Sequence, residues 1–220
     1  MREVDHYVDC ITLVCLAVNF RPKKVKLPML NHIRLALAAV LLTSIIPLVK
    51  AAHAAELDGV SIPETMNAGG KLLYLNGYGV RTYSILGIHV YVAALYLQHP
   101  NRNPEDIIRS PEVKLLNIKF ERNIDAEKAR EAWRDGLAKN CQSPCRLEPE
   151  DVEHFLSGVP AMHAGQTWSL MFMTERAVVE VDGHELATIP KRQFAEAMLA
   201  TFLGPNPGTA KLKKDLLGGS

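Results

Sequence analysis

Hydrophobic and polar positions follow a period of two most clearly at residues 88–97, a run rich in β-branched and aromatic residues. This period places His89 and Tyr91 on one face, and Val90 and Val92 on the other. Both faces are mostly apolar, which predicts a central strand covered on both sides. Shorter runs predict further strands at 57–63, 71–75, 113–120, 167–173, 177–181 and 185–189.

Helical periodicity is clearest near the C-terminus, where Phe194, Met198 and Phe202 recur at a spacing of four. Further helices are predicted at 105–109, 125–139, 149–156 and 209–217. Asn76 and Gly77 predict a turn after the strand at 71–75. Strands come first, then helices, then a strand meander with closing helices. This order predicts an α+β domain with a mostly antiparallel sheet.

The N-terminal quarter has the pattern of a secretory leader. Basic residues precede a 15-residue apolar run at 35–49, and small residues follow it, with Ala-His-Ala at 52–54. A membrane-spanning helix needs roughly 20 apolar residues, so an uncleaved anchor fits less well. Because Met29 would begin a leader of ordinary length, we expect 1–28 to be an over-long start or disordered extension. Residues 29–54 would then be a signal peptide, and 55–220 one periplasmic or secreted domain.

The charge and the cysteine content of the chain limit which binding partners and which metal sites are expected. Of 25 basic and 24 acidic side chains, seven and three lie in the first 55 residues, which leaves 18 and 21 and a net charge of −3. A domain with this charge lacks the excess of basic residues that is typical of proteins that bind nucleic acid or an anionic membrane surface. In an oxidising compartment, Cys141 and Cys145 are expected to form a local disulfide. A zinc site would need His154 and His163, whose spacing matches no zinc pattern, so we expect no metal.

A single arginine, Arg81, stands between a glycine-rich stretch and the apolar run at 88–97. A guanidinium offers a bidentate fork to a carboxylate, so a cation beside an apolar surface suits an amphipathic anion. The alternative is an arginine that only caps a loop. Tyr91 could donate a second hydrogen bond to the same group or be a core tyrosine, and Tyr83 is a weaker candidate for that role.

Other candidates are less specific. Phe194, Met198 and Phe202 could line an acyl channel, although this spacing more often marks plain core. Trp168 could line the pocket or simply pack. Neither an oriented Ser/His/Asp set nor a glycine-rich phosphate loop is recognisable, so no cofactor is expected.

Four segments in order resemble the chalcone isomerase-like family, in its bacterial, secreted branch. They are LNGYGVRTYSILGIHVYVAALYL, KLLNIKFERNIDAEKAREAWRDGL, AGQTWSLMFM with VEVDGHEL, and FAEAMLATFLGPNPGTAKLKKDLLG. The resemblance covers about residues 57–219. It implies an open-faced β-sandwich, in which helices cover one face of a large antiparallel sheet and a cleft lies between sheet and helices.

The family divides into plant enzymes that close a flavanone ring and plastid relatives that bind fatty acids. Arg81 matches the arginine shared by both groups, and Tyr91 lies where the fatty-acid binders carry a tyrosine. The catalytic tyrosine of the enzymes would follow the strand at 113–120, where this chain reads ERNID at 121–125. The resemblance therefore implies a periplasmic, non-catalytic protein that binds a fatty acid or other amphipathic carboxylate.

Two other functions stay open. One is an isomerase or intramolecular lyase acting on a small carbonyl compound, with Arg81 stabilising a developing oxyanion. The other is a structural or interaction protein whose cleft is closed.

We expect export to remove the leader after Ala54, because the small residues there match a signal-peptidase site. Intact-mass spectrometry of the exported protein should give a chain that begins at Ala55. A mass that includes the leader would contradict this prediction.

Overall fold

The computed structural model describes residues 54–83, 86–141 and 143–219. The expected extension at 1–28 and the expected signal peptide at 29–54 lie outside these residues, apart from Ala54. Among the described helices, none has the length and apolar character needed to cross a membrane.

Strands and helices follow one another along the chain in nearly the predicted order. The described elements are β1 (Ala54–Leu57), β2 (Val60–Pro63), β3 (Thr65–Ala68), β4 (Lys71–Tyr83), β5 (Ile88–Leu97), α2 (Pro104–Arg109), β6 (Lys114–Phe120), α3 (Ala126–Asn140), α4 (Pro149–Gly158), β7 (Thr167–Phe172), β8 (Ala177–Val181), β9 (His184–Ile189), α5 (Arg192–Leu203) and α6 (Ala210–Leu216).

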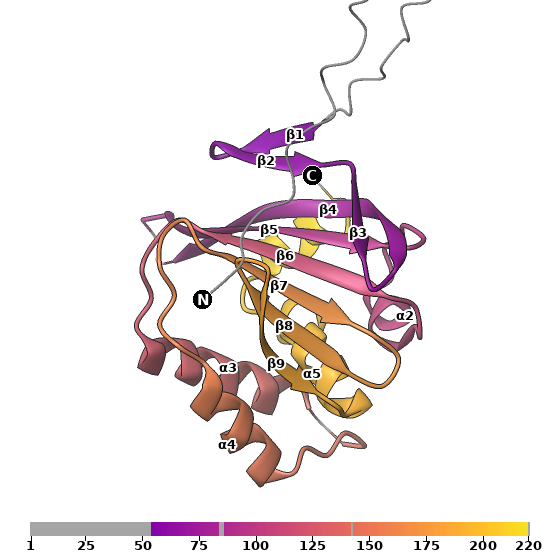
Figure 1. The fold of residues 1–220 in the computed structure, drawn as a ribbon, viewed down its shortest axis with the longest axis vertical. Helices are drawn as coiled ribbons and strands as arrows, with labels where there is room; N and C mark the ends of the chain where they lie inside the picture. The colour runs from indigo at the N-terminus through magenta and orange to yellow at the C-terminus, as the bar shows by residue number, and fades with distance from the viewer. Residues whose placement is uncertain (1–53, 84–85, 142, 220) are drawn as a thin grey trace, which may run out of the picture. The chain divides into compact units, whose positions relative to one another are not determined.

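The main sheet has seven strands in the order β3-β4-β5-β6-β7-β8-β9, so each strand pairs with its neighbour in sequence. All of these pairings are antiparallel. Strands β1 and β2 form a separate hairpin. Figure 1 shows the seven strands in this order, with α5 behind the sheet. The predicted α+β class with a mostly antiparallel sheet is confirmed.

Strand β5 carries apolar side chains into a core on each side of the sheet. On the helix side, Ala93 and Leu95 belong to a cluster that includes Phe194 and Met198 of α5, all four fully buried. On the other side, Tyr96 packs in a second cluster, which includes residues of the β1–β2 hairpin. The strand is therefore covered on both faces, as its alternation predicted.

The predicted turn at Asn76 and Gly77 is wrong, because β4 runs through both residues. The glycines serve a close approach instead. A Cβ added at Gly77 would lie 2.2 Å from the backbone oxygen of Asp215, and one added at Gly79 would lie 2.6 Å from the Asp215 Cβ. Helix α6 therefore packs directly onto the backbone of β4, where any larger side chain would hold it away.

Polar contacts fix α6 in this position. The Asn76 Nδ2 donates to the Leu216 carbonyl at 2.9 Å, while its Oδ1 accepts from the Asn101 backbone N–H at 2.8 Å. The buried Asp215 carboxylate accepts from the Lys211 ammonium at 2.6 Å. Asn76 thus joins the end of α6 to the loop that follows β5.

One further difference concerns the first predicted strand. The single strand expected at 57–63 is a hairpin, because Asp58 and Gly59 adopt positive φ values of 51° and 74° and reverse the chain.

A disulfide joins Cys141 to Cys145, as the sequence predicted. Just before it, Asn140 accepts from the Asn206 backbone N–H at 3.1 Å and donates to the Asn206 carbonyl at 2.8 Å. The end of α3 is thereby tied to the segment before α6.

Replacing Gly77 by alanine should lower the free energy of unfolding by about 3 kcal/mol, because the new methyl group meets a backbone oxygen that cannot move without displacing α6. Denaturant unfolding of Gly77→Ala and of the parent chain measures the difference. Gly158→Ala is the matched control, since a Cβ there would have no neighbour within 4 Å. Equal stability of Gly77→Ala and the parent would contradict the close approach.

Candidate functional site

A cavity of about 780 Å³ lies between the helix-facing side of the sheet and the elements that cover it. Its sheet wall is mainly aromatic and aliphatic, with Tyr91, Ile118, Phe120 and Trp168. The covering wall comes from α3, the end of α5 and the segment at 206–209. This volume falls within the range of about 300–1,000 Å³ that is usual for small-molecule sites.

Charged side chains mark where the cavity meets solvent. Six charged lining residues on α3 and the segment before it are exposed: Arg122, Asp125, Lys128, Glu131, Asp135 and Lys139. Two pairs of them neutralise each other, with Lys128 3.3 Å from Asp125 and Lys139 3.1 Å from Asp135. The cavity therefore has an apolar interior and a mixed-charge opening, which suits a ligand with a long apolar part.

Arg81 of β4 and Tyr91 of β5 are direct register partners, and both line the cavity. Side chains that face each other across an antiparallel pair share one face of the sheet. The Arg81 Nη1 donates to the carbonyl of Gly208, in the segment between α5 and α6. Since a guanidinium has five N–H donors, this bond leaves Arg81 able to bind a further acceptor.

The phenol of Tyr91 is a hydrogen-bond donor at physiological pH. Burial raises the pKa of Tyr91 to about 12, and the nearby Arg81 charge offsets this only in part. The ring packs edge-on against Phe120, with centroids 5.5 Å apart, and Phe120 packs in the same way against Trp168 at 6.1 Å. A line of aromatic rings therefore runs from beside Arg81 along the sheet wall.

The other residues singled out from the sequence fall into two groups: some line the cavity and some are buried in the core. Tyr83 lines the cavity, but the residue is 66% exposed. Phe202 also lines the cavity and packs edge-on against Trp133 of α3. Phe194 and Met198 are fully buried in the core and are not among the lining residues. Of the three residues considered for an acyl channel, only Phe202 reaches the cavity.

Two lining residues carry unpartnered polar atoms: Trp168, for which the sequence left lining and packing both open, and Thr209, which the sequence did not single out. Among the described residues, the Trp168 Nε1 and the Thr209 Oγ1 are the buried side-chain polar atoms without a hydrogen-bond partner. Both residues line this cavity. Thr209 follows Gly208, whose carbonyl holds Arg81. Nothing in the local sequence marks Thr209, because its place beside Arg81 depends on the docking of α6.

The loop after β6 forms part of the cavity. Arg122, Asn123, Ile124 and Asp125 are lining residues, and no tyrosine is present at 121–125. The described lining residues include no histidine, cysteine or serine. The described lining combines hydrogen-bonding side chains with apolar surface.

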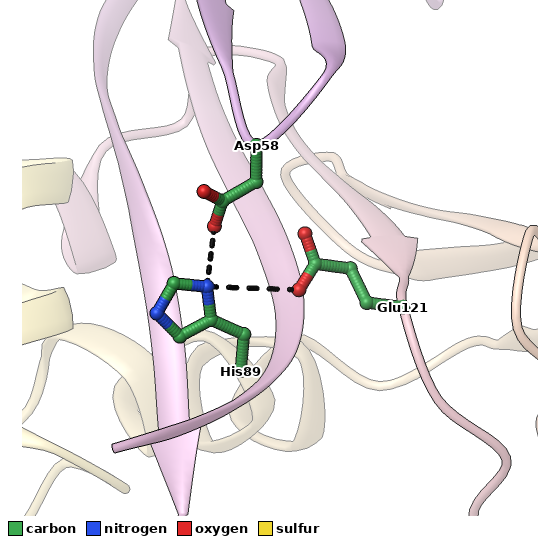
Figure 2. A group of neighbouring side chains, drawn as sticks. All are labelled: Asp58, His89 and Glu121. Atoms are coloured by element: carbon green, nitrogen blue, oxygen red, sulfur yellow. Dashed lines mark ion pairs between the residues drawn. The ribbon is translucent and has the colours of Figure 1, made fainter.

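A separate polar cluster joins the β1–β2 hairpin to the sheet. The His89 Nδ1 lies 2.7 Å from the Asp58 Oδ2 and 4.0 Å from the Glu121 Oε2, as Figure 2 shows. Within the described part of the chain, these are the residues whose donor atoms gather closely enough to hold a metal ion. Both carboxylates face the same nitrogen, however, and 2.7 Å is a hydrogen-bond distance. The cluster fits a charge-assisted contact that fastens the hairpin.

The carboxyl group of Glu121 in this cluster has a pKa raised above its usual value. Burial is the main cause, and the Asp58 carboxylate adds to it, while His89 and Arg122 act in the opposite direction. Arg122 also donates from its Nε to the His89 carbonyl at 2.9 Å. Because Arg122 lines the cavity, this contact places the cluster beside the cavity wall.

Comparison with known proteins identifies the family. The family model described as chalcone isomerase-like matches residues 54–218. The crystal structure of an Arabidopsis thaliana fatty-acid binding protein superposes with a TM-score of 0.63 at 15% sequence identity. The match covers 75% of this chain and 96% of the Arabidopsis chain, and at this identity it shows a shared fold. None of the curated proteins compared with the chain is a match. The chain belongs to the chalcone isomerase-like family.

Proposed function

We propose that this domain binds an amphipathic carboxylate, such as a fatty acid, in the cavity between sheet and helices. The observation that carries the proposal is the pairing of Arg81 with Tyr91 on the wall of a largely apolar cavity. A carboxylate there would accept from the guanidinium and the phenol, while its alkyl chain lay along the aromatic wall. The Arabidopsis protein of the same fold, described as a fatty-acid binding protein, supports this ligand class.

The head group would complete hydrogen bonds that the protein alone leaves incomplete. The Arg81 guanidinium binds one backbone carbonyl, that of Gly208, and keeps further N–H donors. A carboxylate has two oxygens with about four acceptor sites, enough for Arg81 and Tyr91 together. The ligand would thus be held by groups from β4 and β5.

The proposal is for binding without catalysis. The described lining residues offer no histidine, cysteine or serine to act as nucleophile, and the loop at 121–125 has no tyrosine. A closed cleft is at odds with a cavity of about 780 Å³. We place the protein in the periplasm or outside the cell, where the Cys141–Cys145 disulfide would be stable.

Arg81→Ala should weaken fatty-acid binding about 10- to 100-fold, because a charge-assisted hydrogen bond contributes about 1.5–3 kcal/mol. Calorimetric titration of the purified protein with hexadecanoate measures the loss. Arg134→Ala is the matched control, since Arg134 pairs with Glu153 on the surface and does not line the cavity. Unchanged affinity in Arg81→Ala would show that the head group binds elsewhere. Conversion of the ligand to a product would favour the lyase or isomerase alternative.

Tyr91→Phe should weaken binding about tenfold, because it removes one donor to the carboxylate and keeps the ring. The effect should be the same from about pH 6 to about pH 9, since a pKa of about 12 keeps the phenol protonated throughout this range. Tyr96→Phe, on the same strand but in the cluster on the opposite face, should bind like the parent. Equal loss in both variants would indicate a general effect on the sheet.

A further inference from the structure

The segment between α5 and α6, residues 204–209, helps to determine how the Arg81 guanidinium is oriented. The Arg81 Nη1 donates to the Gly208 carbonyl in this segment. A Cβ added at Gly208 would lie 3.5 Å from the Arg81 Nη1 and 3.6 Å from its Cζ, so the guanidinium lies close against this residue. A contact that fixes the Gly208 backbone therefore also fixes the direction of the N–H donors that remain on Arg81.

One side chain, that of Asn140 at the end of α3, bonds both backbone groups of Asn206 in this segment. Its Oδ1 accepts from the Asn206 N–H at 3.1 Å, and its Nδ2 donates to the Asn206 carbonyl at 2.8 Å. Pro205 and Pro207 have no backbone N–H, so Asn206 has the one backbone donor of these three residues. The Asn140 Nδ2 also donates to the Gly136 carbonyl at 2.9 Å, which holds the amide group itself in place.

The packing around Asn140 leaves room for its amide only because residue 204 is a glycine. A Cβ added at Gly204 would lie 2.5 Å from the Asn140 Oδ1. On the other side of Asn206, the Gly208 N–H donates to the Thr201 carbonyl of α5 at 3.1 Å. The backbone that presents the Gly208 carbonyl is thus held between the end of α3 and the end of α5.

We infer that Asn140 is a positioning residue for the carboxylate site, because it holds residues 204–209 so that the Gly208 carbonyl orients the Arg81 guanidinium. Asn140 is not among the described residues that line the cavity, so it acts on a ligand through Arg81. A guanidinium that is already oriented loses less conformational freedom when it binds a carboxylate. This inference rests on the proposed carboxylate site and adds a residue of α3 to the groups of β4 and β5.

Asn140→Ala should weaken hexadecanoate binding about three- to tenfold, because Arg81 must then be ordered when the ligand binds. Calorimetric titration of protein expressed from the full sequence measures the loss. In an Arg81→Ala background, the same substitution should leave the affinity unchanged, since the guanidinium through which Asn140 acts is gone. An equal loss in both backgrounds would show that Asn140 supports the cavity in general, and would overturn the inference.

Asn103→Ala is the matched control for a change that is only structural. Asn103 accepts from the backbone N–H groups of Glu105 and Asp106 at the start of α2, and it is not a lining residue. This variant also loses bonds from an asparagine side chain to the backbone, so it should lower thermal stability and leave the affinity for hexadecanoate unchanged. A loss of affinity in Asn103→Ala as large as that in Asn140→Ala would overturn the inference.

The same titrations separate this inference from the proposed function. If Asn140→Ala binds hexadecanoate like the parent while Arg81→Ala binds it more weakly, the inference is overturned and the proposed function still stands. If Arg81→Ala also binds like the parent, the head group lies elsewhere, and the inference fails together with the carboxylate site.

A second measurement covers the case in which Asn140→Ala does not fold. Coupling between two sites is reciprocal, so a bond that favours binding at Arg81 must itself be stabilised by the bound carboxylate. Saturating hexadecanoate should therefore slow the hydrogen exchange of the Asn206 amide, followed by NMR, in the parent protein but not in Arg81→Ala. Unchanged exchange in the parent, or equal slowing in Arg81→Ala, would overturn the inference.

Discussion

The direct packing of α6 on the backbone of β4 is the contact on which the site depends. Gly77 and Gly79 leave no room for a side chain between strand and helix, and Asn76 bonds to the end of the helix. Because α6 is held there, the residues just before it, Gly208 and Thr209, come to Arg81. Without this contact, the cavity would lose the wall that faces its cation.

The sheet and its helices contribute different properties to the cavity. Neighbouring strands supply a continuous row of side chains on one face, with Arg81, Tyr91 and Phe120 in register. The covering elements supply the opening, and the Asn140 side chain, which donates to the Asn206 carbonyl and accepts from the Asn206 backbone N–H, holds α3 against the segment before α6. A rigid apolar wall with a cation at one side is a suitable scaffold for an extended chain with one charged end.

Local patterns in the sequence predict the strands of the sheet and two residues of the site, Arg81 and Tyr91. The alternation at 88–97 predicts a central strand with Tyr91 on one face, and a short connection then brings Arg81 opposite Tyr91. The role of Gly77 is not predictable in this way, because glycine is equally typical of turns and of close approaches. The deciding partner, α6, ends at Leu216, which is 140 residues from Asn76 in the sequence. Thr209 joins the cavity wall only through tertiary packing, which local periodicity does not contain, and for the same reason the sequence left open whether Trp168 lines the cavity or packs.

The order of the strands has a consequence for how the binding site arises as the chain folds. Strands β3 to β9 each pair with their sequence neighbour, so the sheet can form from contacts between successive strands. The cavity wall beside Arg81, in contrast, joins β4 to the segment just before α6, the last described helix. Ligand binding is therefore possible only after α6 has docked on β4. Bound ligand would favour fully folded molecules over partly folded ones in any competition with proteolysis.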